Sequence, residues 1–293
     1  MNPLITVYPA RRIHTMDPSL PEANAIAVRG DRIVEVGTLE SLRPWLDAHE
    51  HHVDDQFAEA VILPGLIDPH VHPSMMAMLM ATEWITPEAW DLPGREIPAT
   101  VGRDSYLARL AEIEDAHPSG RPLVSFGWHR QFHGEVVRAD LDALSTARPI
   151  LVWGRSFHEI CCNVAGLELV EAAEGAAWDP HIDLETGRMW ESGMAWALQR
   201  LRPLLLDEGR YEVLMEEVAQ MVHRGGVTTI ADAGFGGMAL PDRELEVLAK
   251  VHEGDQVPFR QYLIPQVATF KRVYGAEAED RIAGLPEYSS ERI

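Results

Sequence analysis

The sequence predicts an α/β protein, and three observations carry this prediction. Residues 25–37 contain two alternating apolar runs around Gly30-Asp31, which is typical of a β-hairpin because glycine tolerates a positive φ. Residues 227–264 have the pattern strand, helix, strand, and a unit of this size indicates a parallel sheet with a right-handed crossover. The length of 293 residues is sufficient for one large domain or two ordinary ones.

The first 72 residues are predicted to be mainly β structure. A short strand is expected over 4–8, before the hairpin, and Thr38 is expected to cap a helix that runs to about His49. Residues 60–72 are rich in β-branched and apolar side chains, which predicts a buried strand whose end carries polar groups.

The remaining elements follow from periodicity. Helices are expected over 103–116, around Leu141 and Leu144, over 211–224 and over 243–253, and strands over 123–128, 149–153, 227–232 and 259–264. The helix over 211–224 is expected to end at Gly225-Gly226, and its apolar side chains recur with the helical period of 3.6; they are Val213, Leu214, Val218, Met221 and Val222. The chain after Tyr274 is expected to be a loop that ends at Ile293.

The composition excludes several classes of protein. With 46 acidic and 25 basic side chains, the formal charge is −21, which would repel a phosphate backbone and disfavours nucleic acid as a partner. No apolar stretch approaches the roughly 20 residues that span a bilayer, and the start lacks the features of a secretory signal. The two cysteines are adjacent and form no disulfide framework. We therefore expect a cytoplasmic protein without a membrane partner.

The motif Asp68-Pro-His70-Val-His72 is the sharpest chemical feature. Side chains at i and i+2 of a strand point to the same face, so His70 and His72 would present two imidazoles side by side, a chelating pair for a metal such as Zn²⁺. Asp68 lies on the same face and is predicted to orient a ligand histidine. The alternative is a chance pairing in a chain with 13 histidines.

The segment Pro64-Gly-Leu-Ile-Asp-Pro-His-Val-His72, preceded by β structure, closely resembles the amidohydrolase superfamily. The resemblance implies a metal-dependent-hydrolase (β/α)8 (TIM) barrel whose first strand is residues 61–72, with His70 and His72 as metal ligands. It also implies that residues 1–60 form a β-sandwich segment beside the barrel. The run Gly225-Gly-Val-Thr-Thr-Ile-Ala-Asp232 resembles the second barrel strand.

The segment between these strands resembles the large insertion of the amidohydrolase 3 branch. The residues that carry the resemblance are Phe126-Gly-Trp128, Leu141-Asp142, Arg148-Pro-Ile-Leu-Val-Trp-Gly-Arg155, His158 and Asn163. It implies an α+β insertion subdomain over 73–224 and the hydrolysis of amides, formamides and related carbon–nitrogen bonds. The substrate would be a small molecule, attacked by a metal-activated water on one or two divalent ions, with Zn²⁺ preferred.

Four further residues are predicted to contact substrate. The resemblance places His158 in the substrate cavity, where it would bond a carbonyl or developing oxyanion; a loop-fixing histidine is the alternative. Arg155 would contact a carboxylate or pair with Glu159. Trp128 would be a pocket wall or part of the core, and Asp232, at a strand end, would be catalytic or a helix cap.

Other conspicuous side chains are predicted to be structural. Cys161 and Cys162 would point to opposite faces of a strand and so would not chelate one ion together. His129 and His133 are expected to be exposed loop residues. The methionines near the motif are expected to serve as flexible packing, with a wall at the mouth of the site as the alternative; they are Met75, Met76, Met78 and Met80.

The remaining catalytic set of the superfamily has no counterpart in this sequence. The resemblance implies a strand-eight aspartate as general base, a bridging lysine or glutamate on strand four, and histidines on strands five and six. The two lysines, Lys250 and Lys271, do not lie at suitable strand ends, and neither do His223 and His252. Residues 225–293 therefore correspond to barrel strands two and three with their connecting helices, and we expect a truncated barrel that is inactive by itself.

The sequence therefore predicts the N-terminal part of a metal-dependent hydrolase of carbon–nitrogen bonds other than peptide bonds. Two alternatives stay open: a deaminase or cyclic-amide hydrolase of the same superfamily, and a truncated, non-catalytic binding or regulatory product. An exposed apolar sheet edge would favour aggregation or a homo-oligomer.

Overall fold

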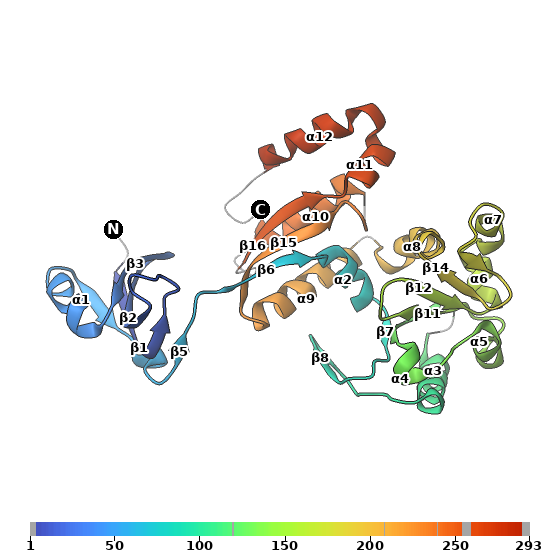
Figure 1. Cartoon of the computed structure of the whole chain (residues 1–293), viewed down its shortest axis with the longest axis horizontal. Helices are drawn as coiled ribbons and strands as arrows, with labels where there is room; N and C mark the ends of the chain where they lie inside the picture. The colour runs from blue at the N-terminus through green and yellow to red at the C-terminus, as the bar shows by residue number, and fades with distance from the viewer. Residues whose placement is uncertain (1–3, 119, 208, 239, 254–258, 289–293) are drawn as a thin grey trace. The chain divides into compact units, whose positions relative to one another are not determined.

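The computed structural model describes residues 4–118, 120–207, 209–238, 240–253 and 259–288. The chain forms two compact units, Met1–Leu66 and Ile67–Ile293 (Figure 1). Both helices and strands are present, many of them in strand–helix order, so the predicted α/β class is confirmed.

The first unit is one mixed sheet covered by a helix. Its strands are β1 (Ile5–His14), β2 (Glu22–Arg29), β3 (Arg32–Gly37), β4 (His51–Val53) and β5 (Val61–Ile62), in the order β3-β2-β1-β4 with β5 also paired to β1. The predicted hairpin is confirmed: β2 and β3 are antiparallel, and Gly30 between them has a φ of 62°. The described residues of this unit form a single sheet, so they do not supply the second layer of a sandwich.

Helix α1 (Leu39–Leu46) begins after Thr38, which caps its first turn as predicted, and lies against this sheet. The hydroxyl of Thr38 accepts a hydrogen bond from the Ser41 backbone N–H at 3.0 Å. Leu42 and Leu46 then face inward and pack in a small core with side chains of β1 and β2. A 3₁₀ turn, Asp55–Phe57, follows β4.

The prediction of one buried strand over 60–72 is wrong. The structure contains two short strands, β5 in the first unit and β6 (Leu66–Val71), separated by Leu63-Pro64-Gly65. Proline lacks the N–H that a sheet ladder needs, and glycine is a poor strand former, so the run is interrupted there. Strand β6 lies at one end of its sheet, and Ile67 is 70% exposed.

The second unit begins with an α+β region that follows β6. Its six-stranded sheet has the order β13-β14-β12-β11-β10-β7, with strands β7 (Glu83–Trp84), β10 (Leu123–Trp128), β11 (Ile150–Gly154), β12 (Glu159–Cys162), β13 (Ile182–Asp183) and β14 (Arg188–Trp190). The surrounding elements are helices α2 (Pro73–Met80), α3 (Arg103–Ala116), α4 (Arg130–His133), α5 (Arg138–Leu144), α6 (Val164–Leu169), α7 (Ala172–Ala176) and α8 (Ser192–Leu205) and the hairpin β8 (Trp90–Leu92)–β9 (Arg95–Ile97). The predicted helix over 103–116 and the two buried strands are confirmed.

The rest of this unit is a three-stranded sheet in the order β16-β15-β6. Helix α9 (Arg210–Arg224) precedes β15 (Val227–Phe235). Helix α10 (Pro241–Glu253) then connects β15 to β16 (Arg260–Pro265), and α11 (Val267–Tyr274) follows β16. Strands β15 and β16 are parallel, which confirms the predicted strand–helix–strand unit. The described residues contain no closed barrel.

Helix α9 buries a face centred on Leu214, Met215 and Val218, and Val213 is 53% exposed. One prediction for the chain after this sheet is wrong. The expected loop after Tyr274 contains a 3₁₀ turn (Gly275–Glu277), helix α12 (Ala278–Gly284) and a second 3₁₀ turn (Leu285–Tyr288); residues 289–293 lie outside the described part.

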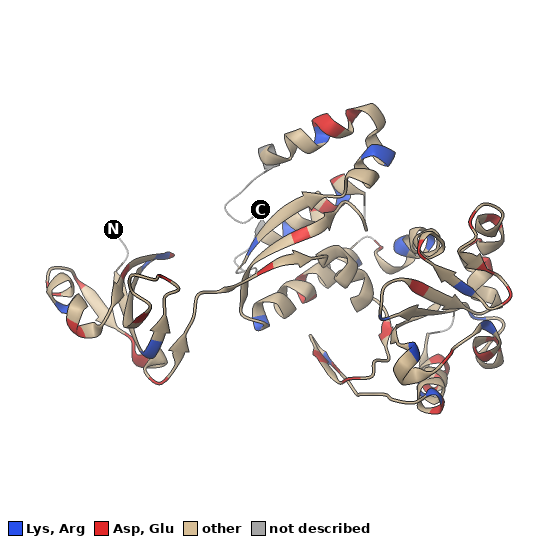
Figure 2. Cartoon of the chain, viewed as in Figure 1, with Lys and Arg blue, Asp and Glu red and all other residues tan. Residues whose placement is uncertain are grey.

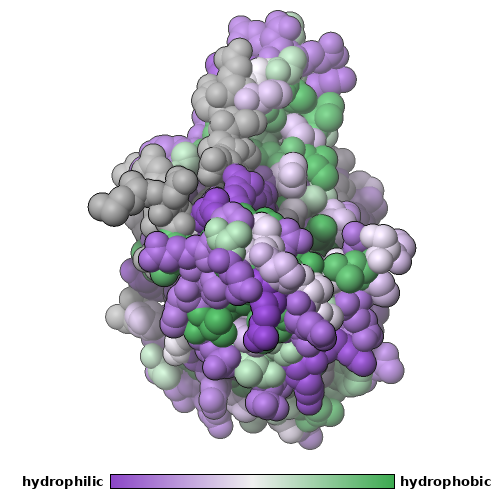
Figure 3. Space-filling view, turned by 90° about the vertical axis from the view of Figure 1, so that its left-hand side faces the viewer, coloured by the Kyte–Doolittle hydropathy of each residue, from purple (hydrophilic) through white to green (hydrophobic). Residues whose placement is uncertain are grey.

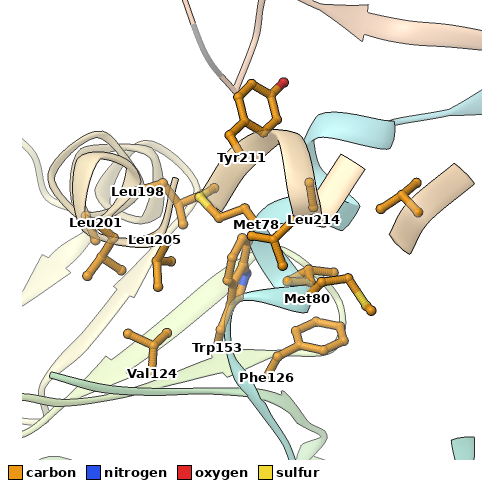
Figure 4. Packing of buried hydrophobic residues seen from close by; sticks show 14 of the residues in the cluster. Met78, Met80, Val124, Phe126, Trp153, Leu198, Leu201, Leu205, Tyr211 and Leu214 are labelled. Atoms are coloured by element: carbon orange, nitrogen blue, oxygen red, sulfur yellow. The ribbon is translucent and has the colours of Figure 1, made fainter. Parts of the chain in front are cut away.

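The main hydrophobic core of the second unit includes side chains of its six-stranded and its three-stranded sheet. Trp153 from the six-stranded sheet, Met78 from α2 and Leu214 from α9 meet in it (Figure 4), and Phe235 from β15 belongs to the same cluster. Cys161 and Cys162 are buried and free, as expected of structural residues, and burial raises the pKa of the Cys161 thiol to about 12. The insertion and the three-stranded sheet therefore share one core.

Charged residues occur throughout both units. Acidic and basic residues are spread over the helices and strands of each unit (Figure 2). The face in Figure 3 is largely hydrophilic, with separate hydrophobic patches. Within the described ranges, no helix is both long and apolar enough to cross a bilayer.

Candidate functional site

His70 and His72 lie together at the end of β6. His70 belongs to the strand, and His72 is the N-cap residue of α2. Their ring centroids are 5.1 Å apart and the ring planes are nearly perpendicular. His70 is exposed and His72 is half-buried, so the pair is open to solvent on one side and supported on the other.

The two imidazoles suit a divalent metal as part of its ligand set. Burial and the neighbouring His70 lower the pKa of His72, which favours the neutral imidazole that a metal requires. In the described part of the chain, no group of three or more His, Cys, Asp or Glu side chains is arranged to hold an ion. The pair thus accounts for two ligands, and a tetrahedral site would need others.

Asp68 contacts the motif differently from the prediction. Its Oδ1 accepts a hydrogen bond from the backbone N–H of His70 at 3.1 Å. This bond fixes the backbone at the first ligand position, whereas the prediction assigned the carboxylate to an imidazole ring.

Asp232 lies in the interior of β15 because the strand runs three residues further than predicted. It is 1% exposed and lines a cavity of about 160 Å³ together with His72. Burial raises the pKa of Asp232 to about 6, although hydrogen bonds from the Gly234 N–H at 3.1 Å and from Gln261 Nε2 at 3.4 Å oppose the shift. A carboxyl with this pKa can change protonation near neutral pH.

Gly234 allows the backbone of β15 to approach His72 closely. A Cβ atom at this position would lie 2.6 Å from His72 Nδ1, which is inside van der Waals contact. The absence of a side chain at Gly234 is therefore a condition for the position of the His72 ring.

A buried polar network supports the first turn of α2 beside this cavity. The Ser74 hydroxyl donates a hydrogen bond to Glu244 Oε1 and lies 2.6 Å from the Tyr211 hydroxyl. The other carboxylate oxygen of Glu244 accepts the Gly236 N–H at 2.8 Å. The network connects α2, α9 and α10 to the end of β15 within two residues of His72.

Glu244 was not predicted as a site residue, although the sequence contains a signal for it. Glu244 precedes Val247 and Leu248 by three and four residues, so it lies on the face of α10 that these two side chains bury. A carboxylate on the buried face of an amphipathic helix requires partners, and this indicates a polar site.

A second cavity, of about 410 Å³, opens beside the histidine pair. Asp68, His70 and His72 contribute to its lining, and most of the remaining lining is apolar. Met75 and Met76 from α2 contribute to the apolar wall; its other members include Leu79, Phe157, Val218, Met221 and Val222. Met75 and Met76 thus contribute to this cavity wall, whereas Met78 and Met80 are buried in the core.

The other predicted contact residues lie elsewhere in the second unit. The His158 side chain is 67% exposed and its Nδ1 is 3.0 Å from Glu191 Oε1. Arg155 pairs with Glu88, so the expected pairing with Glu159 is wrong. Trp128 is buried in a separate core of the insertion and donates Nε1–H to the Gly134 carbonyl at 3.1 Å. None of these side chains lines either cavity.

The prediction that His133 is exposed is wrong. Its ring is fully buried, with Nδ1 accepting the His129 N–H at 3.0 Å and Nε2 lying 2.9 Å from the Thr100 carbonyl oxygen. His129 is half-buried and caps the same short helix, α4. Both residues have structural roles.

The chain matches one protein family in sequence and a metal-dependent hydrolase in fold. The sequence model of the amidohydrolase family matches residues 58–290. An uncharacterized metal-dependent hydrolase from Pyrococcus horikoshii OT3 has a similar fold, with a TM-score of 0.63 and 15% identity over 92% of this chain and 50% of that one.

Two curated proteins show sequence similarity. The exoenzymes regulatory protein AepA of Pectobacterium carotovorum is 27% identical over 169 residues, which cover 56% of this chain and 34% of the relative. The protein LONG AFTER FAR-RED 3 of Arabidopsis thaliana is 24% identical over 231 residues, covering 76% and 37%. This chain thus spans little more than a third of these relatives.

Proposed function

Because this chain belongs to the amidohydrolase family, we propose that it carries part of the metal site of a hydrolase that cleaves carbon–nitrogen bonds other than peptide bonds. The observation that carries the proposal is the pair of adjacent imidazoles, His70 and His72, beside a cavity that also contains buried Asp232. Zn²⁺ is the proposed ion, because imidazole nitrogens suit it.

When bound, the metal would lower the pKa of a water molecule and polarise the substrate carbonyl. The residues of this chain have separate tasks in that chemistry. His70 and His72 hold the ion as neutral imidazoles, and Gly234 and the Asp68–His70 bond keep the pair in place. Asp232 is the proposed proton carrier of this cavity, because its raised pKa lets it hold and release a proton near neutral pH.

The three strands of the sheet are proposed to be part of a (β/α)8 barrel. The parallel pairing of β15 with β16 and the adjacent position of β6 fit such an arrangement. The missing metal ligands would then come from other strands, at the carboxyl ends where barrel active sites lie.

The cavities favour a small amide or formamide as substrate. The larger one is mostly apolar next to the histidine pair, so it suits the hydrocarbon part of such a molecule. His158 is proposed as an additional polar contact, because it follows Phe157 in the chain and Phe157 lines this cavity.

Turnover after metal removal and restoration tests the proposal. The purified chain, treated with a chelator and then with Zn²⁺, is assayed against formamides, N-acyl amines, cyclic amides and aminopurines. We expect any hydrolysis to disappear on chelation, to return with Zn²⁺ and to be strongest on linear amides. Faster reaction of aminopurines or cyclic amides would favour a deaminase or cyclic-amide hydrolase.

Loss of the ligand pair provides the matched test. In His70→Ala and His72→Ala, zinc content should fall, and any hydrolysis should fall with it, whereas His223→Ala, which removes an exposed histidine of α9, should leave both unchanged. Unchanged zinc content in both ligand variants would refute the proposed site.

A further inference from the structure

A third cavity lies next to the His72 cavity and has a different character. It measures about 190 Å³ and shares Met238 and Gln266 with the His72 cavity. Arg202 from α8 and Arg272 from α11 line it, and we call it the arginine cavity. Its remaining described lining is neutral and includes Gln199, Thr269, Met78, Met194 and Leu198.

The two arginines of this cavity have no carboxylate partner within ion-pair distance in the described part of the chain. Arg202 donates from Nη1 to the Met238 carbonyl at 3.4 Å, and no acidic side chain contributes to the described lining. Elsewhere the arginines of this acidic protein are commonly paired: Arg200, two residues before Arg202 on α8, lies 2.8 Å from Glu171, and Arg281 of α12 pairs with Asp242.

Keeping both guanidinium groups in this place has an electrostatic cost. Burial and the neighbouring Arg272 lower the pKa of Arg202, and attraction by Glu244 only partly opposes the shift. Two like charges that face one small cavity would be stabilised by an anion between them. Guanidinium groups suit a carboxylate well because their N–H donors match its two oxygens.

We propose that the arginine cavity binds a carboxylate group of the substrate while the bond to be cleaved lies in the adjoining His72 cavity. The inference rests on the proposed function and narrows its substrate to amides that carry a carboxylate, such as N-acyl amino acids. Arg202 belongs to the insertion and Arg272 to the helix after β16, so the specificity site joins the two regions that share the core.

Equilibrium binding tests this proposal without requiring turnover. The full chain, freed of metal by chelation, is titrated calorimetrically with N-acetylglycine and with N-acetylglycinamide, which lacks the negative charge. We expect the acid to bind at least tenfold more tightly than the amide, and we expect this preference to weaken as salt is added. Equal affinities for acid and amide would overturn the proposal.

Matched variants assign the effect to the cavity. Arg202→Gln and Arg272→Gln should each weaken binding of N-acetylglycine at least tenfold and leave binding of the amide unchanged. Lys271→Gln removes the same charge from the neighbouring exposed residue, which does not line the cavity, and should bind like the original chain. Equal losses in Arg272→Gln and Lys271→Gln would show a general charge effect and overturn the proposal.

The design also separates this proposal from the proposed function. If the chain binds no zinc and hydrolyses nothing, but still prefers the acid in an Arg272-dependent way, the anion site stands and the hydrolase assignment falls. If zinc binding and hydrolysis are found without that preference, the proposed anion site is refuted and the proposed hydrolase function is kept. Arg272 is exposed, so Arg272→Gln should fold. If Arg202→Gln does not fold, Arg272→Gln alone decides whether the arginine cavity binds the carboxylate.

Discussion

Asp232 couples the stability of the protein to pH. The unfolded chain loses the aspartate proton near the ordinary value of 3.8, whereas buried Asp232 keeps it up to about pH 6. Between these values the native state binds more protons, so the stabilisation is complete below about pH 4 and is lost as the pH rises through 6. The difference in pKa corresponds to about 3 kcal/mol.

We therefore predict that Asp232→Asn removes this dependence in the metal-free chain. The free energy of unfolding of the variant, relative to the original chain, should rise by about 3 kcal/mol between pH 4 and pH 7. Urea unfolding at several pH values measures it. Parallel pH profiles for the two proteins would contradict the assignment of the raised pKa to Asp232.

Gly234 gives a second prediction for a single residue. In Gly234→Ala the new methyl group would collide with His72 Nδ1, so the ring must move and zinc affinity should fall at least about tenfold. Gly284→Ala is the control, because a Cβ there meets no atom within 4 Å. Equal zinc affinities in the two variants would show that the close approach does not position His72.

The candidate site was only partly predictable from residues. The Asp-Pro-His-Val-His motif identified the imidazole pair because i and i+2 side chains of a strand share a face. It did not predict that Asp68 would bond a backbone N–H, or that His133 would be buried. Those outcomes depend on neighbours that are distant in the sequence, such as Thr100 beside His133.

At the scale of elements, the Ser74–Tyr211–Glu244 network ties three helices to the strand end. Tyr211→Phe removes one hydroxyl of the network and leaves the Ser74–Glu244 bond in place. We expect a loss of about 1 kcal/mol in the free energy of unfolding. Tyr106→Phe is the comparison, because this equally buried hydroxyl makes a longer contact of 3.4 Å with Ser125 and should lose less.

Denaturant unfolding of the two tyrosine variants provides the measurement. A smaller loss in the free energy of unfolding for Tyr211→Phe than for Tyr106→Phe would show that the Tyr211 hydroxyl does not stabilise the fold through the network. Because Tyr211→Phe leaves the histidines untouched, a weaker zinc affinity in this variant would in addition show that the network positions His72 through α2.

Elements with a strong apolar period were predicted well, and those governed by tertiary context were not. Helix α9 spans Arg210–Arg224, close to the expected 211–224, because its apolar positions and the glycines that follow it are local signals. Strand β6 was expected to be buried because its side chains are apolar, but burial also requires a partner layer, and Ile67 is exposed. In α9 likewise, Val213 follows the apolar period but is 53% exposed, since a helix face is buried only where another element meets it.

At the scale of the whole molecule, the outer strands of the three-stranded sheet present apolar side chains. Ile67 on β6 is 70% exposed, and Tyr262 and Ile264 on β16 are 62% and 47% exposed. Outer strands of a sheet that carry exposed apolar side chains favour pairing between chains. We predict that the chain self-associates at micromolar concentration, as measured by light scattering after size-exclusion chromatography.

A charge at such a strand should oppose this association. Ile264→Lys is expected to shift the population toward the monomer, whereas Val213→Lys, at a similarly exposed position on α9, should not. A chain that stays monomeric at all concentrations would be evidence against the sheet edges as association surfaces, and so would equal effects of the two variants.

The dissociation constant of Zn²⁺, determined by competition with a chromophoric chelator, is the decisive measurement for the histidine pair. His70 and His72 are proposed to hold together the metal of this amidohydrolase family member. We predict saturable binding that weakens by at least about tenfold in His70→Ala and in His72→Ala, and is unchanged in His223→Ala. The same zinc affinity in the original chain and in all three variants would show that His70 and His72 do not hold the metal.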